Sequence, residues 1–316
     1  MRLIVQRNVG AVGDLNDISG RLSSLLGPLT GEPVALAGGI TNRNFRATFG
    51  GAEYVIRRPG KDTDLLGIDR EAERLATDAA ARLGIAPAVT TMIDGCLVTE
   101  FIACSPVTAQ ELAAGVEEIA GALRSFHGSA VRLPTRFRVS DLLGDYAMIV
   151  EEHGGSLPAG YAGAIAAAER IAAALPAAEA RPCHNDLLVG NIIRAQRDGR
   201  MMIIDWEYAG MGDPRFDLGN VSINSEFDET TDERLLAAYH GRAPSDGERA
   251  ALKLMRALSD AREAAWAVVQ GEISTLDFDF EGYARKHFER LEASCADPRF
   301  EQWLALAGGE SAGEAS

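Results

Sequence analysis

Cysteine is scarce in this sequence, with four residues among 316, widely spaced and without a C-x-x-C pair. This scarcity speaks against a disulfide framework and a structural zinc site, and it fits a reducing compartment. Long apolar runs are also missing, because no window approaches the roughly 18 apolar residues of a membrane span. The N-terminal M-R-L-I-V-Q-R-N is too short an apolar run for a signal peptide. We therefore expect a cytoplasmic protein.

Basic residues are outnumbered, since 31 Lys and Arg stand against 46 Asp and Glu, a net charge of −15. An acidic balance of this size repels phosphate backbones and anionic lipid headgroups. It disfavours nucleic-acid and membrane partners and favours a cationic small molecule. At roughly 150 residues per domain, the length suggests two domains or lobes. The sequence makes no prediction of oligomeric state.

The first third of the chain favours short strands. Five β-favouring runs occur, at residues 33–37, 44–49, 53–58, 88–93 and 96–101. Gly50-Gly51 and Asp94-Gly95 join two pairs of these runs, and both dipeptides are typical of two-residue hairpin turns. Between the hairpins, residues 69–83 have helical spacing, with Asp69 as the N-cap. Residues 1–102 are therefore predicted to form an α+β lobe with a five-stranded antiparallel sheet and one helix.

From residue 108 onward the pattern is mainly helical. Capping boxes of the form S/T-x-x-E are expected at Thr108/Glu111, Thr230/Glu233 and Ser245/Glu248. An alanine-rich helix is expected within 162–180, ending before Pro176, and two β-like runs within 183–206 predict a small hairpin. Residues 103–307 are therefore predicted to form a mainly α-helical lobe. Residues 308–316 lack large apolar side chains and are expected to be a flexible tail.

The small hairpin carries the residues most suggestive of chemistry. C-H-N-D-L-L-V-G-N-I-I spans residues 183–193, and M-I-I-D-W-E-Y-A-G-M-G-D-P-R-F-D-L begins at residue 202. Asp186, Asn191 and Asp205 give the order acid, amide, acid, which in phosphoryl-transferring enzymes supplies a base and metal ligands. Asp217 opens an apolar helical run, so we expect it to be structural, as a helix cap or as a brace of the loop.

The pair H-N-D-L-x-x-G-N and I-I-D-W-E-Y-A resembles the choline/ethanolamine kinase branch of the aminoglycoside-phosphotransferase-like kinases. The resemblance extends from about Ala37 to Phe288 and implies a bilobal protein-kinase-like fold that uses ATP and Mg²⁺. It implies that Asp186 is the catalytic base, that His184 supports the loop, and that Asn191 and Asp205 bind magnesium. It also places Glu207 beside the substrate, where this carboxylate could assist a second metal ion.

The first lobe supplies candidate nucleotide-binding residues. In G-G-I-T-N-R-N-F, residues 38–45, glycine permits close approach to phosphates, and the polar side chains add donors. The candidates are Gly39, Thr41, Asn42 and Asn44. By the resemblance, Arg57 on the third strand pairs with phosphates and has Glu73 on the helix as its partner, a better match than Glu71. By the same resemblance, residues 100–102 would present backbone groups to adenine. The candidates are Glu100 and Ile102, at the two ends of this segment.

The resemblance places aromatic and acidic side chains around the substrate. Tyr208, Trp266 and Tyr283 are the aromatic candidates, since aromatic faces attract cations. Choline kinases commonly have a second tryptophan where this chain has Glu263, and the expected acid falls on Asn224, with Glu226 two residues later. One more carboxylate and one fewer aromatic ring suit a cation with N–H donors at least as well as choline.

Several functions remain open from the sequence. Choline is the first expected acceptor and ethanolamine the second, while thiamine and aminoglycosides fit the same fold. A nucleotide-binding pseudokinase is an alternative from another class, although the intact motif residues argue against it. A metal-dependent hydrolase using His184, Asp186 and Asp205 is the third alternative, and it lacks the paired histidines of such sites.

Overall fold

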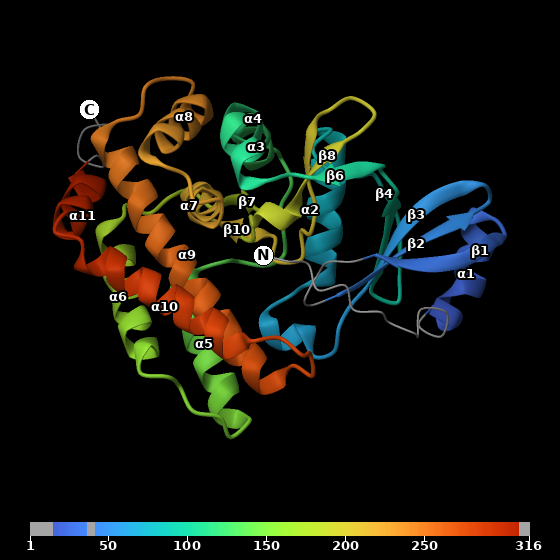
Figure 1. Cartoon of the computed structure of the whole chain (residues 1–316), viewed down its shortest axis with the longest axis horizontal. Helices are drawn as coiled ribbons and strands as arrows, with labels where there is room; N and C mark the ends of the chain where they lie inside the picture. Colours follow the sequence, from blue (N-terminus) through green and yellow to red (C-terminus); the bar gives the residue numbers. More distant parts are fainter. Residues whose placement is uncertain (1–14, 37–41, 310–316) are drawn as a thin grey trace.

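The computed structural model describes residues 15–36 and 42–309, which form two lobes. Figure 1 shows the N-terminal sheet at one side and the C-terminal helices at the other, with α2 between them. The sheet has the antiparallel order β1-β2-β3-β5-β4. Its strands are β1 (Leu29–Leu36), β2 (Arg43–Phe49), β3 (Ala52–Arg58), β4 (Val89–Ile93) and β5 (Cys96–Glu100). The predicted five-stranded sheet is confirmed.

The turns and the helix of this lobe form for the reasons that the sequence indicates. Gly50 and Gly51 have φ values of 57° and 86°, and Asp94 and Gly95 have 49° and 76°. These are the left-handed conformations that two-residue hairpin turns require. Helix α2 (Arg70–Arg82) begins after Asp69, whose side chain accepts a hydrogen bond from the backbone N–H of Ala72. The predicted N-cap is confirmed.

Helix α1 (Asn16–Leu26) precedes the sheet and was not predicted. Leu15, Ile18 and Leu22 lie on one face of it and are buried against Phe45, Phe49, Ile56 and Val98 of the sheet. Strand β1 begins at Leu29, four residues earlier than expected, and a register irregularity lies between its pairs at Thr30 and Val34. Gly31 and Pro33 lie within the strand and interrupt the alternation of apolar and polar residues. The sequence pattern therefore does not reveal where the strand begins.

The C-terminal lobe is built around one long helix. Its helices are α3 (Ala109–Ala114), α4 (Val116–His127), α5 (Val139–Glu152), α6 (Gly160–Ala174), α7 (Pro214–Asn224), α8 (Glu229–His240), α9 (Asp246–Ile273), α10 (Phe280–Ala296) and α11 (Phe300–Gly309). Helix α9 crosses the lobe in contact with α5, α7, α10 and α11 (Figure 1). In the described part of the chain, no helix has the combination of length and apolar character needed to cross a bilayer.

Two details of this lobe differ from the sequence predictions. The predicted capping boxes at Thr108/Glu111 and Ser245/Glu248 are confirmed, whereas the prediction of one at Thr230/Glu233 is wrong. Helix α8 instead begins after Asp228, which accepts a hydrogen bond from the N–H of Thr231 at 2.8 Å. The expected tail began at residue 308, but α11 includes Gly308 and Gly309. Residues 310–316 lie outside the described part of the chain.

The small hairpin is confirmed as β8 (Ile192–Ala195) paired with β9 (Met201–Ile203). Strand β6 (Cys104–Pro106) extends it to three strands, and β7 (Arg181–Cys183) pairs with β10 (Gly210–Gly212). These three strands were not predicted, because each has only three residues. Together the two small sheets fix both ends of the segments 184–191 and 204–209, which carry the candidate catalytic residues.

The lobes are tied together by direct contacts. The alanine face of α2, with Ala76 and Ala80, packs against Leu187 and Ile203 of the C-terminal lobe. A short 3₁₀ helix, η2 (Thr63–Leu66), reaches α5, where the hydroxyl of Tyr146 donates to the backbone oxygen of Leu66 at 3.0 Å. These contacts hold α2 and its polar residues beside the small hairpin.

Candidate active site

His184 holds the loop that carries Asp186. The ring is fully buried, and its Nδ1 accepts a hydrogen bond from the backbone N–H of Asp186 at 3.2 Å. Its Nε2 donates to the backbone oxygen of Ile204 at 3.0 Å, which joins this loop to the end of β9. Burial lowers the pKa of His184, so the ring is neutral near pH 7. His184 is therefore placed to orient the loop, as the resemblance implies.

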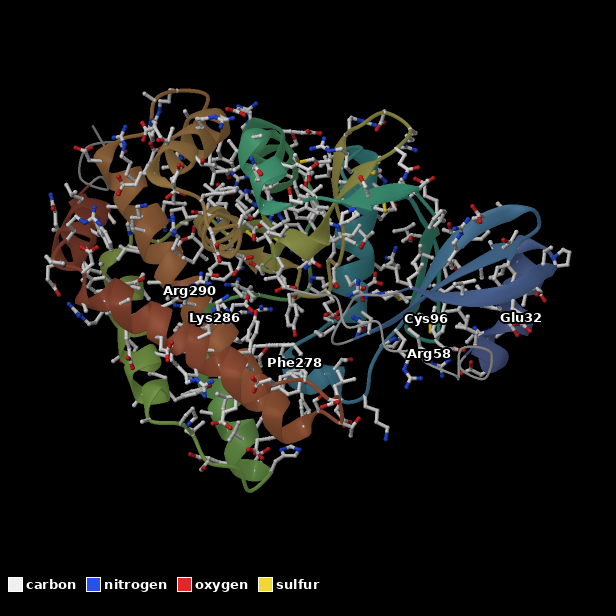
Figure 2. All side chains as sticks on the ribbon, viewed as in Figure 1. Glu32, Arg58, Cys96, Phe278, Lys286 and Arg290 are labelled. Carbon is white, nitrogen blue, oxygen red and sulfur yellow. The ribbon has the colours of Figure 1, made fainter. Side chains whose placement is uncertain are left out.

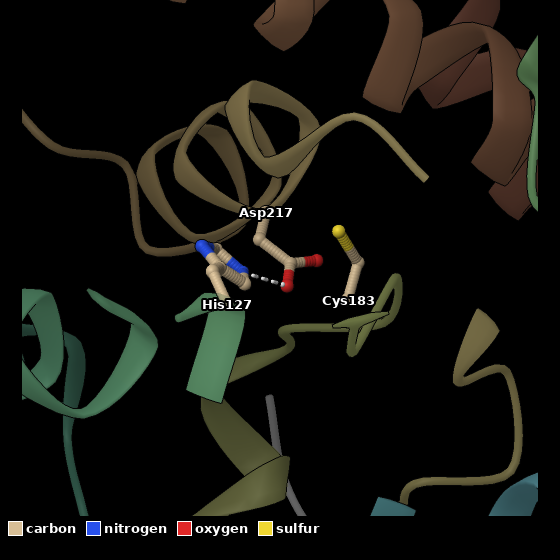
Figure 3. Close-up of side chains that lie close together, drawn as sticks. All are labelled: His127, Cys183 and Asp217. Carbon is tan, nitrogen blue, oxygen red and sulfur yellow. Dashed lines mark hydrogen bonds and ion pairs between the residues drawn. The ribbon is translucent and has the colours of Figure 1, made fainter. Parts of the chain in front are cut away.

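Asp217 braces the same loop from α7. Its carboxylate accepts hydrogen bonds from the backbone N–H of His184 at 2.8 Å and of Asn185 at 2.7 Å. His127 on α4 donates to it through Nε2 at 2.9 Å, as Figure 3 shows. The N-cap of α7 is Asp213, so the expectation that Asp217 caps a helix is wrong, while its role as a brace is confirmed.

Cys183 lies beside this brace, and His127, Cys183 and Asp217 offer ligand atoms within 4.8 Å of one another (Figure 3). The three residues do not form a free metal site, because both carboxylate oxygens of Asp217 accept hydrogen bonds. Nδ1 of His127 is paired with the hydroxyl of Tyr239 at 2.8 Å. Burial raises the pKa of the Cys183 thiol, so it stays protonated. The cluster is structural.

The carboxylate of Asp186 is held by two side chains. Oδ1 accepts from Nη1 of Arg262 at 2.8 Å, and Oδ2 accepts from Nδ2 of Asn191 at 3.2 Å. Asn191 also donates to the backbone oxygen of Asp186 at 2.8 Å. Burial raises the pKa of Asp186 to about 7, against the opposing charge of Arg262. A carboxylate with this pKa can accept a proton near neutral pH.

Arg57 on β3 gathers three acids. Its Nε lies 3.2 Å from Oε1 of Glu73 on α2, and its Nη2 contacts Asp205 and lies 3.5 Å from Oε2 of Glu207. Glu73 is fully buried, whereas Glu71 pairs with Arg74 at the surface. The structure therefore brings Arg57, Glu73, Asp205 and Glu207 together from both lobes.

A second arginine, Arg70, completes this polar network. Its Nη1 lies 2.8 Å from Oε2 of Glu73 and 3.4 Å from Oε2 of Glu207, and its Nη2 donates to Oδ1 of Asn42. Asn42 in turn donates to Glu207 at 2.8 Å. Burial raises the pKa of Glu207 to about 7. Asn42 therefore links the segment before β2 to the second lobe.

The remaining nucleotide candidates differ in their placement. Asn44 on β2 lies opposite Arg57 in the sheet, while Gly39 and Thr41 lie outside the described residues. The N–H of Glu100 donates to the backbone oxygen of Ala88 at 2.9 Å, and that of Phe101 to Glu53 at 3.0 Å. These two N–H groups are therefore used within the sheet. Of residues 100–102, Ile102 is the one left to present its backbone N–H to a ligand.

The substrate candidates form a second cluster around α9. Nε1 of Trp266 donates to the hydroxyl of Tyr208 at 2.9 Å, and the ring centroids of Trp266 and Tyr283 are 5.9 Å apart. The hydroxyl of Tyr283 donates to Oε2 of Glu263 at 2.9 Å. Phe278, in the loop before α10, extends this aromatic group toward the N-terminal lobe (Figure 2).

Glu226 stands apart from this cluster. It follows α7 with a φ of 55°, and its side chain is exposed. Among the described residues it forms no hydrogen bond or ion pair with Glu263, Trp266 or Tyr283. The structure therefore brings Tyr208, Glu263, Trp266 and Tyr283 together. It places Glu207 in the network around Arg57 and leaves Glu226 outside both groups.

Sequence reasoning missed both Arg262 and Arg70. A signal for Arg262 is present, because A-R-E-A-A-W places two charges within an otherwise apolar stretch of α9, where only paired charges are tolerated. Arg70 lies three residues before Glu73, a spacing that places both on one face of a helix.

The described donors fit a magnesium ion. Asp205 and Glu207 supply carboxylate oxygens, and Nδ2 of Asn191 is engaged with Asp186, so its amide oxygen is the atom suited to a metal. Hard oxygen ligands of this kind are those that Mg²⁺ prefers. The pairing of Asp205 with Arg57 offsets the negative charge of Asp205.

Comparison with known proteins identifies the family of the chain. The profile of the phosphotransferase enzyme family matches residues 32–255. LicA of Haemophilus influenzae is 26% identical over 220 residues, which cover 66% of this chain and 62% of LicA. Ethanolamine kinase 2 of Mus musculus is 37% identical over 126 residues, which cover 34% of this chain and 33% of that protein. The chain thus matches only part of the length of these two relatives.

Three solved structures match nearly the whole chain. LicA of Streptococcus pneumoniae, a choline kinase, has a TM-score of 0.76 at 27% identity over 90% of this chain and 99% of its own. A LicA complex with AMP has a TM-score of 0.71 at 26% identity, covering 91% and 98%. A choline/ethanolamine kinase family protein from Mesorhizobium loti has a TM-score of 0.77 at 30% identity, covering 93% and 98%. The chain belongs to the phosphotransferase enzyme family and, within it, to the choline/ethanolamine kinases.

Proposed function

We propose that this protein is a small-molecule kinase that transfers the γ-phosphoryl group of ATP, with Mg²⁺, to the hydroxyl of choline or ethanolamine. The observation that carries the proposal is the position of Asp186. It lies between the polar network around Arg57 and the aromatic cluster around Trp266, where a phosphate donor and a cationic alcohol can meet. The names and substrates of the relatives support the same reaction.

Asp186 acts as the base in this proposal. The hydroxyl oxygen of the acceptor forms a bond to the γ-phosphorus, and the bond from that phosphorus to the oxygen bridging to the β-phosphate breaks, which releases ADP. The acceptor proton passes to Asp186 and then to solvent. Asn191 and the loop braced by His184 keep the carboxylate oriented during the transfer. Such a positioned base typically contributes about 100-fold or more to the rate.

The nucleotide would lie on the side of the first lobe. Arg57 and Arg70 supply guanidinium donors for phosphates, and we assign the cradle for the phosphates to the segment with Gly39, Thr41, Asn42 and Asn44. Adenine would meet the backbone at Ile102. Asn191 and Asp205 would hold Mg²⁺, assisted by Glu207, and the bound ion would neutralise negative charge on the phosphates. Residues 1–102 then serve the nucleotide and residues 103–307 the acceptor.

The first test is ATP consumption with Mg²⁺ against choline, ethanolamine, thiamine and kanamycin. We expect turnover with choline or ethanolamine, and we expect it to be lower by about 100-fold or more in an Asp186→Asn protein. Turnover with thiamine or kanamycin alone would keep the phosphoryl transfer and overturn the acceptor. ATP binding without turnover on any of the four compounds would support the pseudokinase alternative.

A further inference from the structure

Arg262 brings a positive charge into the site that is proposed to receive a cationic acceptor. The residue is 1% exposed and lies on α9, next to Glu263 and one turn before Trp266. Its Nη1 donates both to Oδ1 of Asp186 and to Oε1 of Glu263, each at 2.8 Å. One buried guanidinium therefore joins the proposed base to the acid that stands where an aromatic residue was expected.

The charges of this group favour a single positive charge on the acceptor. When Asp186 is ionised, as a base must be to accept a proton, Asp186 and Glu263 carry two negative charges, and Arg262 offsets one of them. A buried charge without a counter-ion raises the free energy of the protein. One further positive charge would neutralise the negative charge that remains in this group. A molecule with one ammonium group meets this requirement.

The aromatic faces are partly occupied by the protein itself. The guanidinium carbon of Arg262 lies 4.4 Å from the centroid of the Tyr208 ring, a cation–π distance. Trp266 donates to the Tyr208 hydroxyl and Tyr283 donates to Glu263, and these hydrogen bonds fix the rings at their edges without covering their faces. A quaternary ammonium depends on free aromatic faces because it has no N–H to donate. An ammonium with N–H groups can instead donate to a carboxylate such as Glu263.

Arg262 also has donors to spare. Its Nε and Nη2 are buried and have no hydrogen-bond partner among the described residues. Unsatisfied buried donors are destabilising, so a ligand oxygen beside them gains from the contact. The hydroxyl oxygen of the acceptor must approach Asp186 in any case, since Asp186 takes its proton. That oxygen can therefore receive a hydrogen bond from the guanidinium.

We infer that Arg262 and Glu263 together make this enzyme selective for amino alcohols whose ammonium retains N–H groups, and that they disfavour quaternary ammonium alcohols. Glu263 receives the ammonium N–H, and Arg262 occupies the Tyr208 face while it positions Asp186. This inference rests on the proposed kinase function and narrows its substrate class.

The test is a methylation series that alters only the nitrogen of the acceptor. We would measure kcat and KM with ethanolamine, N-methylethanolamine, N,N-dimethylethanolamine and choline at fixed Mg·ATP. We expect kcat/KM to fall along the series, with a drop of about tenfold or more where the last N–H is lost, because a charge-assisted hydrogen bond is lost there. Equal or higher kcat/KM for choline would overturn the inference and leave the kinase function intact. No turnover with all four compounds would instead count against the proposed function.

Two variants identify the residues responsible. Glu263→Gln should lower kcat/KM for ethanolamine more than kcat/KM for choline. The ratio of the ethanolamine value to the choline value should therefore fall. Arg262→Met should raise the choline-to-ethanolamine ratio by freeing the Tyr208 face, and it should also lower kcat for both through Asp186. Arg170→Met, which removes an exposed arginine from α6, is the matched control and should leave the ratio unchanged.

Each variant would be checked for folding by its thermal unfolding curve and for ATP binding. An unchanged ratio in both folded site variants would overturn the assignment to Arg262 and Glu263. If Arg262→Met fails to fold, Glu263→Gln and the series on the unaltered protein still decide the question.

Discussion

The proposed nucleotide side and the proposed acceptor side of the site differ in how firmly their charges are fixed. On the nucleotide side, the side chains of Arg57 and Asp205 are 11% and 17% exposed. On the acceptor side, those of Arg262 and Asp186 are 2% and 10% exposed. An ion pair that lies closer to solvent costs less free energy to separate than one that is more deeply buried. The comparison teaches that Arg57 can leave Asp205 for a ligand, while Arg262 stays with Asp186.

Replacing Asp186 with asparagine tests the acceptor side with the largest expected effect. The amide introduced by Asp186→Asn cannot take the acceptor proton, so turnover should fall by about 100-fold or more while ATP affinity is retained. Steady-state kinetics and ATP titration measure the two quantities separately, with exposed Asp141→Asn as the control. A variant with normal turnover would refute the role of Asp186.

Replacing Asp205 with asparagine tests the nucleotide side. Losing one negative charge beside the proposed metal should weaken ATP binding in the presence of Mg²⁺ by about tenfold or more, since even supporting groups of metal sites matter to that extent. Calorimetric titration with Mg²⁺ and with EDTA measures the effect, and the acceptor KM should change little. If both proteins respond equally to Mg²⁺, the metal assignment fails.

Replacing Asp217 with asparagine tests the brace that serves both sides. Although burial raises it, hydrogen bonds from His127 and the loop hold the pKa of Asp217 below its usual value. The unfolded chain then binds this proton at higher pH than the native protein does, so the stabilisation is present above about pH 4 and is lost as the pH falls.

We expect the Asp217→Asn protein to be less stable at pH 7 by about 2 kcal/mol, because an amide cannot accept as many of these hydrogen bonds. Urea unfolding at several pH values measures this difference, which should shrink in acid. A difference that is constant with pH would contradict the assigned ionisation.

The smallest effect on stability is expected at the start of α8, which lies away from both the nucleotide side and the acceptor side of the site. Asp228→Ala should cost about 1 kcal/mol because it removes an N-cap, whereas Thr230→Ala should cost little. Thermal unfolding compares the two variants, and kinetics should be normal in both. The reverse order of stability would contradict the observed cap and restore the sequence prediction.

Local patterns predicted what local interactions determine. The hairpin turns at Gly50-Gly51 and Asp94-Gly95 and the N-cap Asp69 depend on neighbours within a few residues, and all three are confirmed. The contact of Arg57 with Asp205 joins residues 148 positions apart, yet the family resemblance placed both in the candidate site.

The contact of Arg262 with Asp186 could not be predicted from the sequence. The two residues are 76 positions apart, and no spacing within α9 indicates that partner. Helix α1 was not predicted for a different reason. Its apolar face is buried only because the helix packs against Phe45 and Phe49 of the sheet. Strands β7 and β10 are too short for any periodicity, and their pairing exists only in the folded chain.

The backbone at Asp205 limits which residues can serve there. Asp205 has a φ of 68°, and Asn185 in the neighbouring loop has 66°. Asparagine and aspartate tolerate this left-handed conformation better than other residues with side chains, and glycine alone does better. A glutamate at 205 would keep the carboxylate but strain the backbone, and a glycine would relieve the backbone but lose the carboxylate. Few residues can therefore replace Asp205 in the proposed magnesium site, and substitutions meant to change metal binding have more options at the neighbouring ligands.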